Sequence, residues 1–236
     1  MRSTIAALAL LTIALATPIA AIAEGRASPN QRTIQVAGVG EAQAPPDLAV
    51  LSLAIETHAA TAADAAADNG GLAQKVSDAL RAKLGNKGKT WTGGYSLYPE
   101  YSDDSHPNAK PVITGYRAEN TITVQTAALD LVGPLIDAAI AAGANRVNSL
   151  DFNLRDDNRA RNEAITKAAK DAQAQGQALA AALGLKLGPI INATTESNER
   201  PPPMFRAAAM GANNSTPVQA GEVTVPATVS LTYEIE

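Results

Sequence analysis

The sequence predicts an α+β protein, made of a ferredoxin-like βαββαβ unit and a second, smaller α+β lobe. Residues 48–154 predict the order strand, helix, strand, strand, helix, strand, which is the split βαβ pattern. One strand before this region, a long alanine-rich helix and two strands after it remain, and they can form the second lobe. No internal repeat at a fixed period divides the chain in another way.

Alternating apolar and polar residues predict two N-terminal strands. The first begins at residues 33–36, and Gly38 and Gly40 should interrupt it as bulge or bend residues. The second covers residues 48–57. One side of the second strand is wholly apolar and should face the core: Ala49, Leu51, Leu53 and Ile55.

A helix is predicted from Thr61, which can cap its N-terminus, to Leu84, with Gly85 as its stop. Its middle, Asn69-Gly70-Gly71, is a weak helix-forming sequence. Apolar side chains recur every four residues along this helix and should form a ridge: Leu72, Val76, Leu80 and Leu84.

The rest of the ferredoxin-like unit is a pair of strands, a short helix and a last strand. Residues 91–101 and 112–126 predict the two strands, with a polar loop between them. Asp130 should cap the short helix, which Gly143 ends. Residues 146–154 alternate as the last strand.

The longest predicted helix covers residues 158–183 and belongs to the second lobe, together with strands over residues 187–195 and 222–236. Alanine has the best helix propensity but removes little surface from water, so the small-residue ridge of this helix favours close contact with another helix or another chain. The ridge consists of Ala160, Ala164, Ala168 and Ala172.

The N-terminus has the pattern of a secretory signal peptide over residues 1–23, with a basic start, an apolar stretch and an exit after Ala23. We expect export to the periplasm, a flexible leader over residues 24–32 and one folded domain over residues 33–236. The inner lobe should cover about residues 46–154, and the outer lobe residues 33–45 with 155–236. No later apolar run reaches the roughly 18 residues of a membrane helix, so none is expected after signal removal.

Composition excludes several classes of protein. The formal net charge of −4 argues against nucleic-acid binding, which needs clustered Lys and Arg. The absence of cysteine excludes disulfides, thiolate metal sites and thiol catalysis. An exported protein without disulfides must be stabilised by its core or by its partners, and we expect a homo-oligomer that completes the burial.

No group of residues predicts a metal or cofactor site. His58 ends a strand and should be exposed. His106, beside Asp103 and Asp104, fits a solvated turn better than a cation site, because a zinc site needs three or four convergent ligands. Gly38-Val39-Gly40 lacks the third glycine and the following helix of a dinucleotide loop.

Catalytic patterns are equally weak. Ser96 lacks the glycine of a nucleophile elbow and a histidine partner. Asp151, Asp156 and Asp157 are carboxylates close in sequence, and glycoside hydrolysis uses a pair of carboxylates, but the last two are explained more simply by favourable charge at a helix N-terminus. The chain is therefore predicted not to be an enzyme.

Two further segments are candidate contact surfaces. Trp91, Tyr95, Tyr98 and Tyr101 lie within eleven residues; alternation puts Tyr98 opposite the other three unless a bulge intervenes, and either core packing or an interface or ligand surface explains them. A loop carries Met204, Phe205 and Met210 after three prolines, and it either docks a partner or folds back on its own domain.

The order of several motifs resembles the SIMPL-domain family, long labelled a domain of unknown function, over essentially the whole chain after the signal. The turn before Trp91 departs from the family pattern. The motifs are Val36-Ala37-Gly38-Val39-Gly40-Glu41, Pro46-Asp47-Leu48-Ala49, Tyr95-Ser96-Leu97-Tyr98-Pro99-Glu100-Tyr101, Gly115-Tyr116-Arg117-Ala118, Ala142-Gly143-Ala144-Asn145, Leu183-Gly184-Leu185-Lys186-Leu187-Gly188 and Pro217-Val218-Gln219-Ala220-Gly221-Glu222.

The resemblance implies a periplasmic or outer-membrane-associated protein. Family members include one that assembles into a large channel-like oligomer and others linked to defence against oxidative stress, and the family has no established catalytic residues. Together with the sequence, this predicts a non-enzymatic, oligomeric envelope component, whose protective role would be indirect because the chain has no cysteine. A small-ligand binding module that uses the aromatic strand is the alternative, and an enzyme of unknown chemistry comes third.

Overall fold

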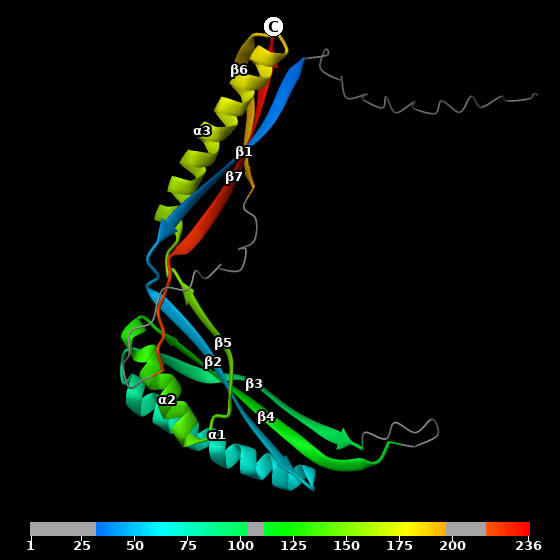
Figure 1. Ribbon diagram of the computed structural model, residues 1–236, viewed down its shortest axis with the longest axis vertical. Helices are drawn as coiled ribbons and strands as arrows, with labels where there is room; N and C mark the ends of the chain where they lie inside the picture. Colours follow the sequence, from blue (N-terminus) through cyan, green and yellow to red (C-terminus); the bar gives the residue numbers. More distant parts are fainter. Residues whose placement is uncertain (1–31, 103–110, 197–215) are drawn as a thin grey trace, which may run out of the picture. The chain divides into compact units, whose positions relative to one another are not determined.

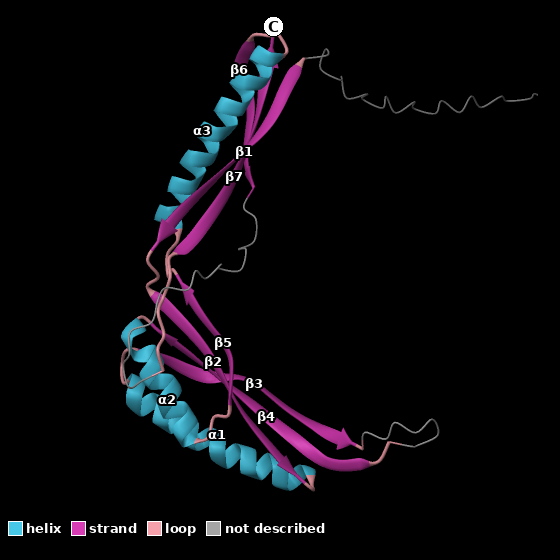
Figure 2. Cartoon of the chain, viewed as in Figure 1, coloured by secondary structure: helices cyan, strands magenta, loops and turns pink. Residues whose placement is uncertain are grey.

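The computed structural model describes residues 32–102, 111–196 and 216–236, which form two antiparallel sheets and three α-helices (Figures 1 and 2). The strands are β1 (Thr33–Ala44), β2 (Leu48–Ala59), β3 (Gly88–Tyr101), β4 (Ile113–Thr126), β5 (Arg146–Asn153), β6 (Leu187–Glu196) and β7 (Val223–Ile235). The helices are α1 (Ala62–Leu84), the short 3₁₀ helix η1 (Leu129–Leu131), α2 (Val132–Ala142) and α3 (Asn158–Ala182).

The four-stranded sheet has the order β3-β4-β2-β5, and every neighbouring pair in it is antiparallel. Helices α1 and α2 cover the same face of this sheet (Figure 1). The apolar side of β2 faces this layer, as predicted, and packs against the ridge of α1. The largest fully buried side chains all belong to this layer: Leu51, Leu53, Ile55, Val76, Leu80, Val124, Val132 and Leu135.

Both predicted ends of α1 are confirmed. The Thr61 side chain accepts a hydrogen bond from the Asp64 backbone N–H (3.1 Å), and Gly85 follows the last residue with φ of 56°. The weak middle of the helix has a role that the sequence did not reveal. Asn69 is fully buried, and its side-chain amide donates to the backbone oxygens of Ile55 (2.8 Å) and Ala118 (3.0 Å), which joins the helix to β2 and β4.

The prediction that Asp130 caps the short helix is wrong. Asp130 lies within η1, and Leu131 holds the N-cap position of α2 without a side-chain hydrogen bond. The 3₁₀ turn takes up the residues before α2, so the helix begins at Val132, one residue after the cap position. Gly143 ends α2 in the left-handed conformation, as predicted.

The three-stranded sheet has the order β1-β7-β6, and α3 packs on β1 and β7. The prediction that Gly38 and Gly40 interrupt the first strand is wrong, because β1 pairs with β7 without a register shift from Thr33 to Ala44. These glycines instead admit the helix. A Cβ atom on Gly38 would lie under 3.0 Å from backbone atoms of Ala168 and Ala172 in α3.

The alanine ridge of α3 is the other half of this contact. Ala164, Ala168 and Ala172 are completely buried, and Ala160 nearly so, among residues of β1 and β7. The ridge was predicted as a contact surface for a second chain. Its surface is already used inside this chain, so it is removed from the candidate interfaces.

Several predictions lie outside the described residues: the signal peptide and its cleavage after Ala23, His106, and the loop residues Met204, Phe205 and Met210. Within the described ranges, no helix has both the length and the apolar character needed to cross a membrane.

Candidate functional site

A bulge in β3 rearranges the aromatic residues. Trp91 pairs with Thr123 and Tyr98 with Arg117, whereas the register shifts between Thr92 and Gly94. Cross-strand partners share a face, and Thr123 and Arg117 share one face of β4, so Trp91 and Tyr98 lie on the same side of the sheet.

Tyr95 pairs with Asn120 and therefore lies on the other side of β3. Simple alternation predicts that Trp91 and Tyr95 share a face and that Tyr98 lies on the other. The extra residue in β3 reverses both assignments, because one bulge residue exchanges the faces of all residues beyond it. A second register shift, between Glu100 and Tyr101, means that simple alternation does not give the face of Tyr101 either.

The aromatic residues of β3 do not belong to the core. Trp91, Tyr95, Tyr98 and Tyr101 are between 46% and 55% exposed, and Leu97 among them is also exposed. β3 is an edge strand of its sheet, so these side chains surround a strand with only one hydrogen-bonded neighbour. Of the two explanations for these aromatic residues, core packing is therefore wrong.

The backbone of β3 can also be oriented. The N–H of Asn145 donates to the Ala54 oxygen (3.1 Å) at the β5 side of β2, which fixes the direction of the β2 backbone groups. Alternation along paired strands then carries this direction through β4 to β3. The residues whose backbone groups point to the free edge of β3 are Thr90, Thr92, Tyr95, Leu97 and Pro99. Pro99 fits this orientation, because an edge position needs no N–H.

The corresponding edge of β1 is covered. The Asp171 carboxylate accepts from the Val39 N–H (2.9 Å), and the Lys167 ammonium donates to the Glu41 oxygen (2.9 Å). Both side chains come from α3 and occupy outward-pointing backbone groups of the edge strand. Among the described residues, no side chain does this for the outward-pointing groups of β3.

The face of the sheet opposite α1 and α2 carries a network of charges around His58. The ring Nδ1 lies 3.1 Å from Glu100 Oε2, and Nε2 lies 3.1 Å from Glu56 Oε1. The hydrogen bond with Glu100, assisted by Glu56, raises the pKa of His58 above its usual value. Gly115 of β4 lies beside this contact, and a Cβ atom there would lie 3.1 Å from the backbone oxygen of Ala59.

Arginines complete the network. Arg146 pairs with Glu56 (3.1 Å between Nη1 and Oε2) and with Glu119, and Arg117 lies 3.8 Å from Glu56. The sequence predicts that His58 is exposed but gives no sign of its partners. Glu56 and His58 do lie on one face of a predicted strand, but their partners come from β3, β4 and β5, which no local pattern places there.

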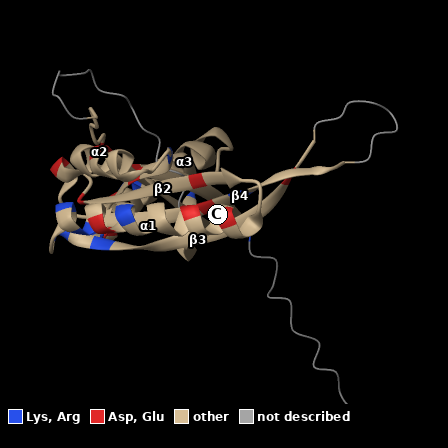
Figure 3. Cartoon of the chain, turned by 90° about the horizontal axis from the view of Figure 1, so that it is seen from below, with Lys and Arg blue, Asp and Glu red and all other residues tan. Residues whose placement is uncertain are grey.

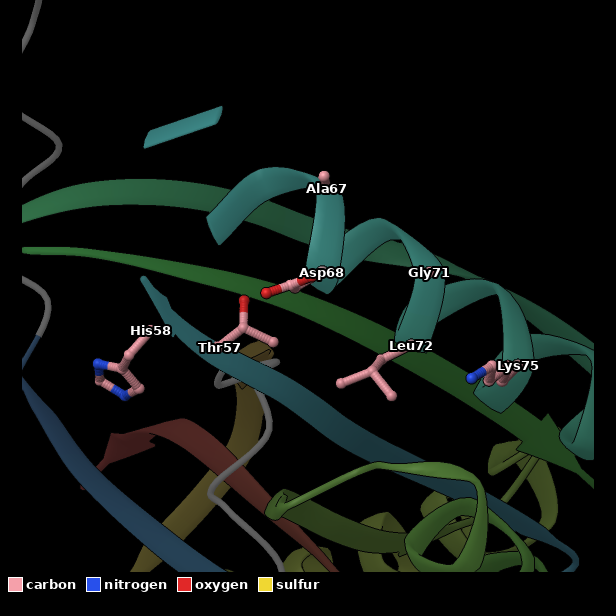
Figure 4. Close-up of a pocket in the computed structure, with 7 residues that line it drawn as sticks. All are labelled: Thr57, His58, Ala67, Asp68, Gly71, Leu72 and Lys75. Carbon is pink, nitrogen blue, oxygen red and sulfur yellow. The ribbon is translucent and has the colours of Figure 1, made fainter. Parts of the chain in front are cut away.

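A hollow of about 510 Å³ opens between the end of β2 and the side of α1 (Figure 4). It is lined by Thr57, His58, Ala67, Asp68, Gly71, Leu72 and Lys75. Neither Trp91 nor Tyr95 belongs to this lining. Both signs of charge occur along α1 (Figure 3), and no group of acidic residues and histidines suited to a metal ion occurs in the part of the chain that the structure describes.

Comparison with known proteins gives a consistent result over the whole folded region. The SIMPL family model, described as a protein of unknown function (DUF541), matches residues 34–233. The 26 kDa periplasmic immunogenic protein of Brucella melitensis is 34% identical, over 89% of this chain and 89% of its own length. The uncharacterized protein YggE of Escherichia coli K12 is 28% identical, over 91% of this chain and 85% of its own length.

Proposed function

Because this chain belongs to the SIMPL family of proteins of unknown function, and a relative is named a periplasmic protein, we propose that it is a periplasmic, non-enzymatic component that works as a homo-oligomer. In this proposal the chains associate along β3. The observation that carries it is the uncovered edge of β3, whose backbone groups and aromatic side chains are both available to a second chain.

The length and composition of β3 support strand pairing between chains. β3 has 14 residues, which is long for an edge strand, and its exposed side chains include a tryptophan, three tyrosines and Leu97. An exposed, long edge strand with apolar side chains is a template for pairing with another chain unless it is blocked. The edge of β1 in the same molecule is blocked by side chains of α3, so β3 is favoured over β1 as the strand through which chains associate.

The proposal has three further parts, which concern what the oligomer does. A channel-like oligomer, association with the outer membrane and protection against oxidative stress are parts of this proposal that the resemblance to the family suggests. Without cysteine, a protective effect would come from assembly or binding. We also propose a ferredoxin-like class for the four-stranded unit, supported by its strand order and by the two helices on one face.

The mass of the exported protein in solution tests the assembly. Light scattering behind a sizing column should give, at micromolar concentration, several times the mass of one exported chain, which is below the 24.2 kDa of the chain with its signal peptide. Leu97 is one of the residues whose backbone groups point to the free edge of β3. The variant Leu97→Lys places a charge beside that edge and should lower the mass. Leu183→Lys is the matched control, because Leu183 is also an exposed leucine but lies at the end of α3.

A monomer across the micromolar range would refute assembly. An oligomer that Leu97→Lys and Leu183→Lys leave equally intact would refute β3 as the interface. Circular dichroism on both variants establishes that a change in mass does not come from unfolding.

A further inference from the structure

The edge of β2 continues beyond the strand that pairs with it. β5 pairs with β2 from Leu48 to Ala54. One step further, the Asn145 side chain replaces a strand: its amide nitrogen donates to the Glu56 oxygen (2.8 Å) and its oxygen accepts from the Glu56 N–H (3.0 Å). His58 is the next residue whose backbone groups point to this edge. Within the described ranges, no residue of another segment hydrogen-bonds them.

Helix α1 forms the second wall of the hollow beside this edge. In Figure 4, Asp68 and Leu72 point from α1 toward β2, and Lys75 follows one turn later. Asp68 and Lys75 are seven residues apart, which corresponds to roughly 10.5 Å along a helix. Neither forms an ion pair with another described residue, so the two charges are available to a ligand.

The hollow has space for the backbone of a bound peptide. A Cβ atom on Gly71 would meet nothing within 4 Å, so this turn of α1 is open. The His58 ring does not compete for a ligand, because both of its nitrogens are occupied by Glu100 and Glu56. The polar edge, one apolar side chain and two opposite charges are therefore presented side by side.

This combination is complementary to a short peptide with free termini. Three extended residues span at most about 10–11 Å, which matches the separation of Asp68 and Lys75 along the helix. An ammonium group fits Asp68, a carboxylate fits Lys75, and an apolar central side chain fits Leu72 between them. The hollow of about 510 Å³ is wide open to solvent, so a peptide would remain partly exposed in it and would bind weakly.

We propose that the hollow between β2 and α1 binds an extended, zwitterionic peptide of about three residues, which hydrogen-bonds the free backbone groups of His58 at the end of β2. The site is separate from the β3 edge and does not depend on assembly. This site differs from the ligand surface that the sequence predicts on the aromatic strand β3, although both belong to the same sheet.

Titration of the exported protein with the tripeptide alanyl-leucyl-alanine, followed by calorimetry and by amide chemical shifts, tests the proposal. We expect weak, saturable binding, with shifts concentrated in β2 and α1. The same tripeptide with an acetylated N-terminus and an amidated C-terminus should bind much more weakly, because both charges are lost.

Two variants and two controls locate the site. Asp68→Asn and Lys75→Gln should each weaken binding by roughly two- to fivefold, since each removes one charge partner at an exposed site. Asp78→Asn and Lys83→Gln remove similar charges from α1 outside the hollow and should leave binding unchanged. All four variants should keep the parent mass in light scattering, which separates this test from that of assembly.

Three results would overturn the proposal: no saturable binding of the free tripeptide, equal binding of the blocked tripeptide, or equal affinity in the Asp68→Asn, Lys75→Gln and control variants. Shifts confined to β3 would assign the peptide to the aromatic strand and would also overturn it.

Discussion

The two sheets of this protein are covered by their helices in two different ways. On the four-stranded sheet, Leu, Ile and Val side chains from α1, α2 and the strands fill the space between the layers. On the three-stranded sheet, alanines of α3 rest on Gly38 and Gly40 of β1, so that the backbones of helix and strand nearly touch. A chain with few large apolar residues can therefore build a closely packed layer by bringing backbones together.

The difference extends to the exposed edges. The edge of β1 is covered by Asp171 and Lys167 of the same helix that packs so closely, whereas no side chain among the described residues hydrogen-bonds the outward-pointing backbone groups of β3. Close packing of α3 brings its charged side chains within reach of the strand edge. The more widely spaced layer of α1 leaves its edge strand open, and this is the strand through which we propose assembly.

The largest expected loss of stability comes from filling the narrow space between α3 and the three-stranded sheet. Gly38→Ala should lower the free energy of unfolding by about 3–5 kcal/mol, because the added Cβ meets backbone atoms of α3 that cannot rotate away. Urea unfolding followed by circular dichroism measures the loss. Ala172→Gly should not rescue the variant, since the atoms in contact are backbone atoms.

The matched control for this prediction is Gly70→Ala in α1. Its Cβ would meet nothing within 4 Å, and alanine favours the helix over glycine. We expect unchanged stability or a gain of about 0.5–1 kcal/mol. Similar losses for the two variants would contradict close packing as the cause.

These glycines also show where sequence patterns stop being informative. Gly38 and Gly40 were predicted as local interruptions, which is what an isolated strand pattern implies. Their actual partner is a helix about 130 residues away in the sequence. Elements defined by local chemistry, such as the cap at Thr61, the stop at Gly85 and the apolar side of β2, were predicted well.

The candidate site was predicted less well than the fold. The aromatic cluster was visible in the sequence, but the bulge beside Gly93 that sorts its faces was not, because the bulge is defined by the register with β4. The ion network of His58 and the hollow beside Asp68 depend on contacts between separate elements. Residue types alone give no signal for them.

A medium effect is expected in the core of the four-stranded sheet. Leu80 is completely buried, and Leu80→Ala should lower the free energy of unfolding by about 2–4 kcal/mol, because it leaves a cavity that neighbouring side chains fill only in part. Leu183→Ala, at an exposed leucine, should cost less than about 0.5 kcal/mol. A loss at Leu80 larger than that of Gly38→Ala would reverse the order that the two packing modes imply.

The smallest expected effect concerns pH, and it should distinguish the two sheets. Since the folded-state pKa of His58 is raised, its contribution to stability is present below the unfolded value, about 6.5, and is lost as pH rises through the folded pKa. In a pH titration by NMR, the His58 ring should have a midpoint above 6.5, and the accompanying amide shifts should occur in β2, β3 and β4. The three-stranded sheet should be unaffected over this range.

The partners of His58 provide the decisive variants. Glu100→Gln removes the largest cause of the raised pKa and should lower the midpoint more than any other single change in the network. Glu163→Gln, whose carboxylate pairs with Lys167 on α3, is the control and should leave the midpoint unchanged. A parent midpoint at or below 6.5, or one that Glu100→Gln does not move, would mean that exposure to water outweighs the ion pairs. The charged face of the four-stranded sheet would then respond to pH no more than the three-stranded sheet does.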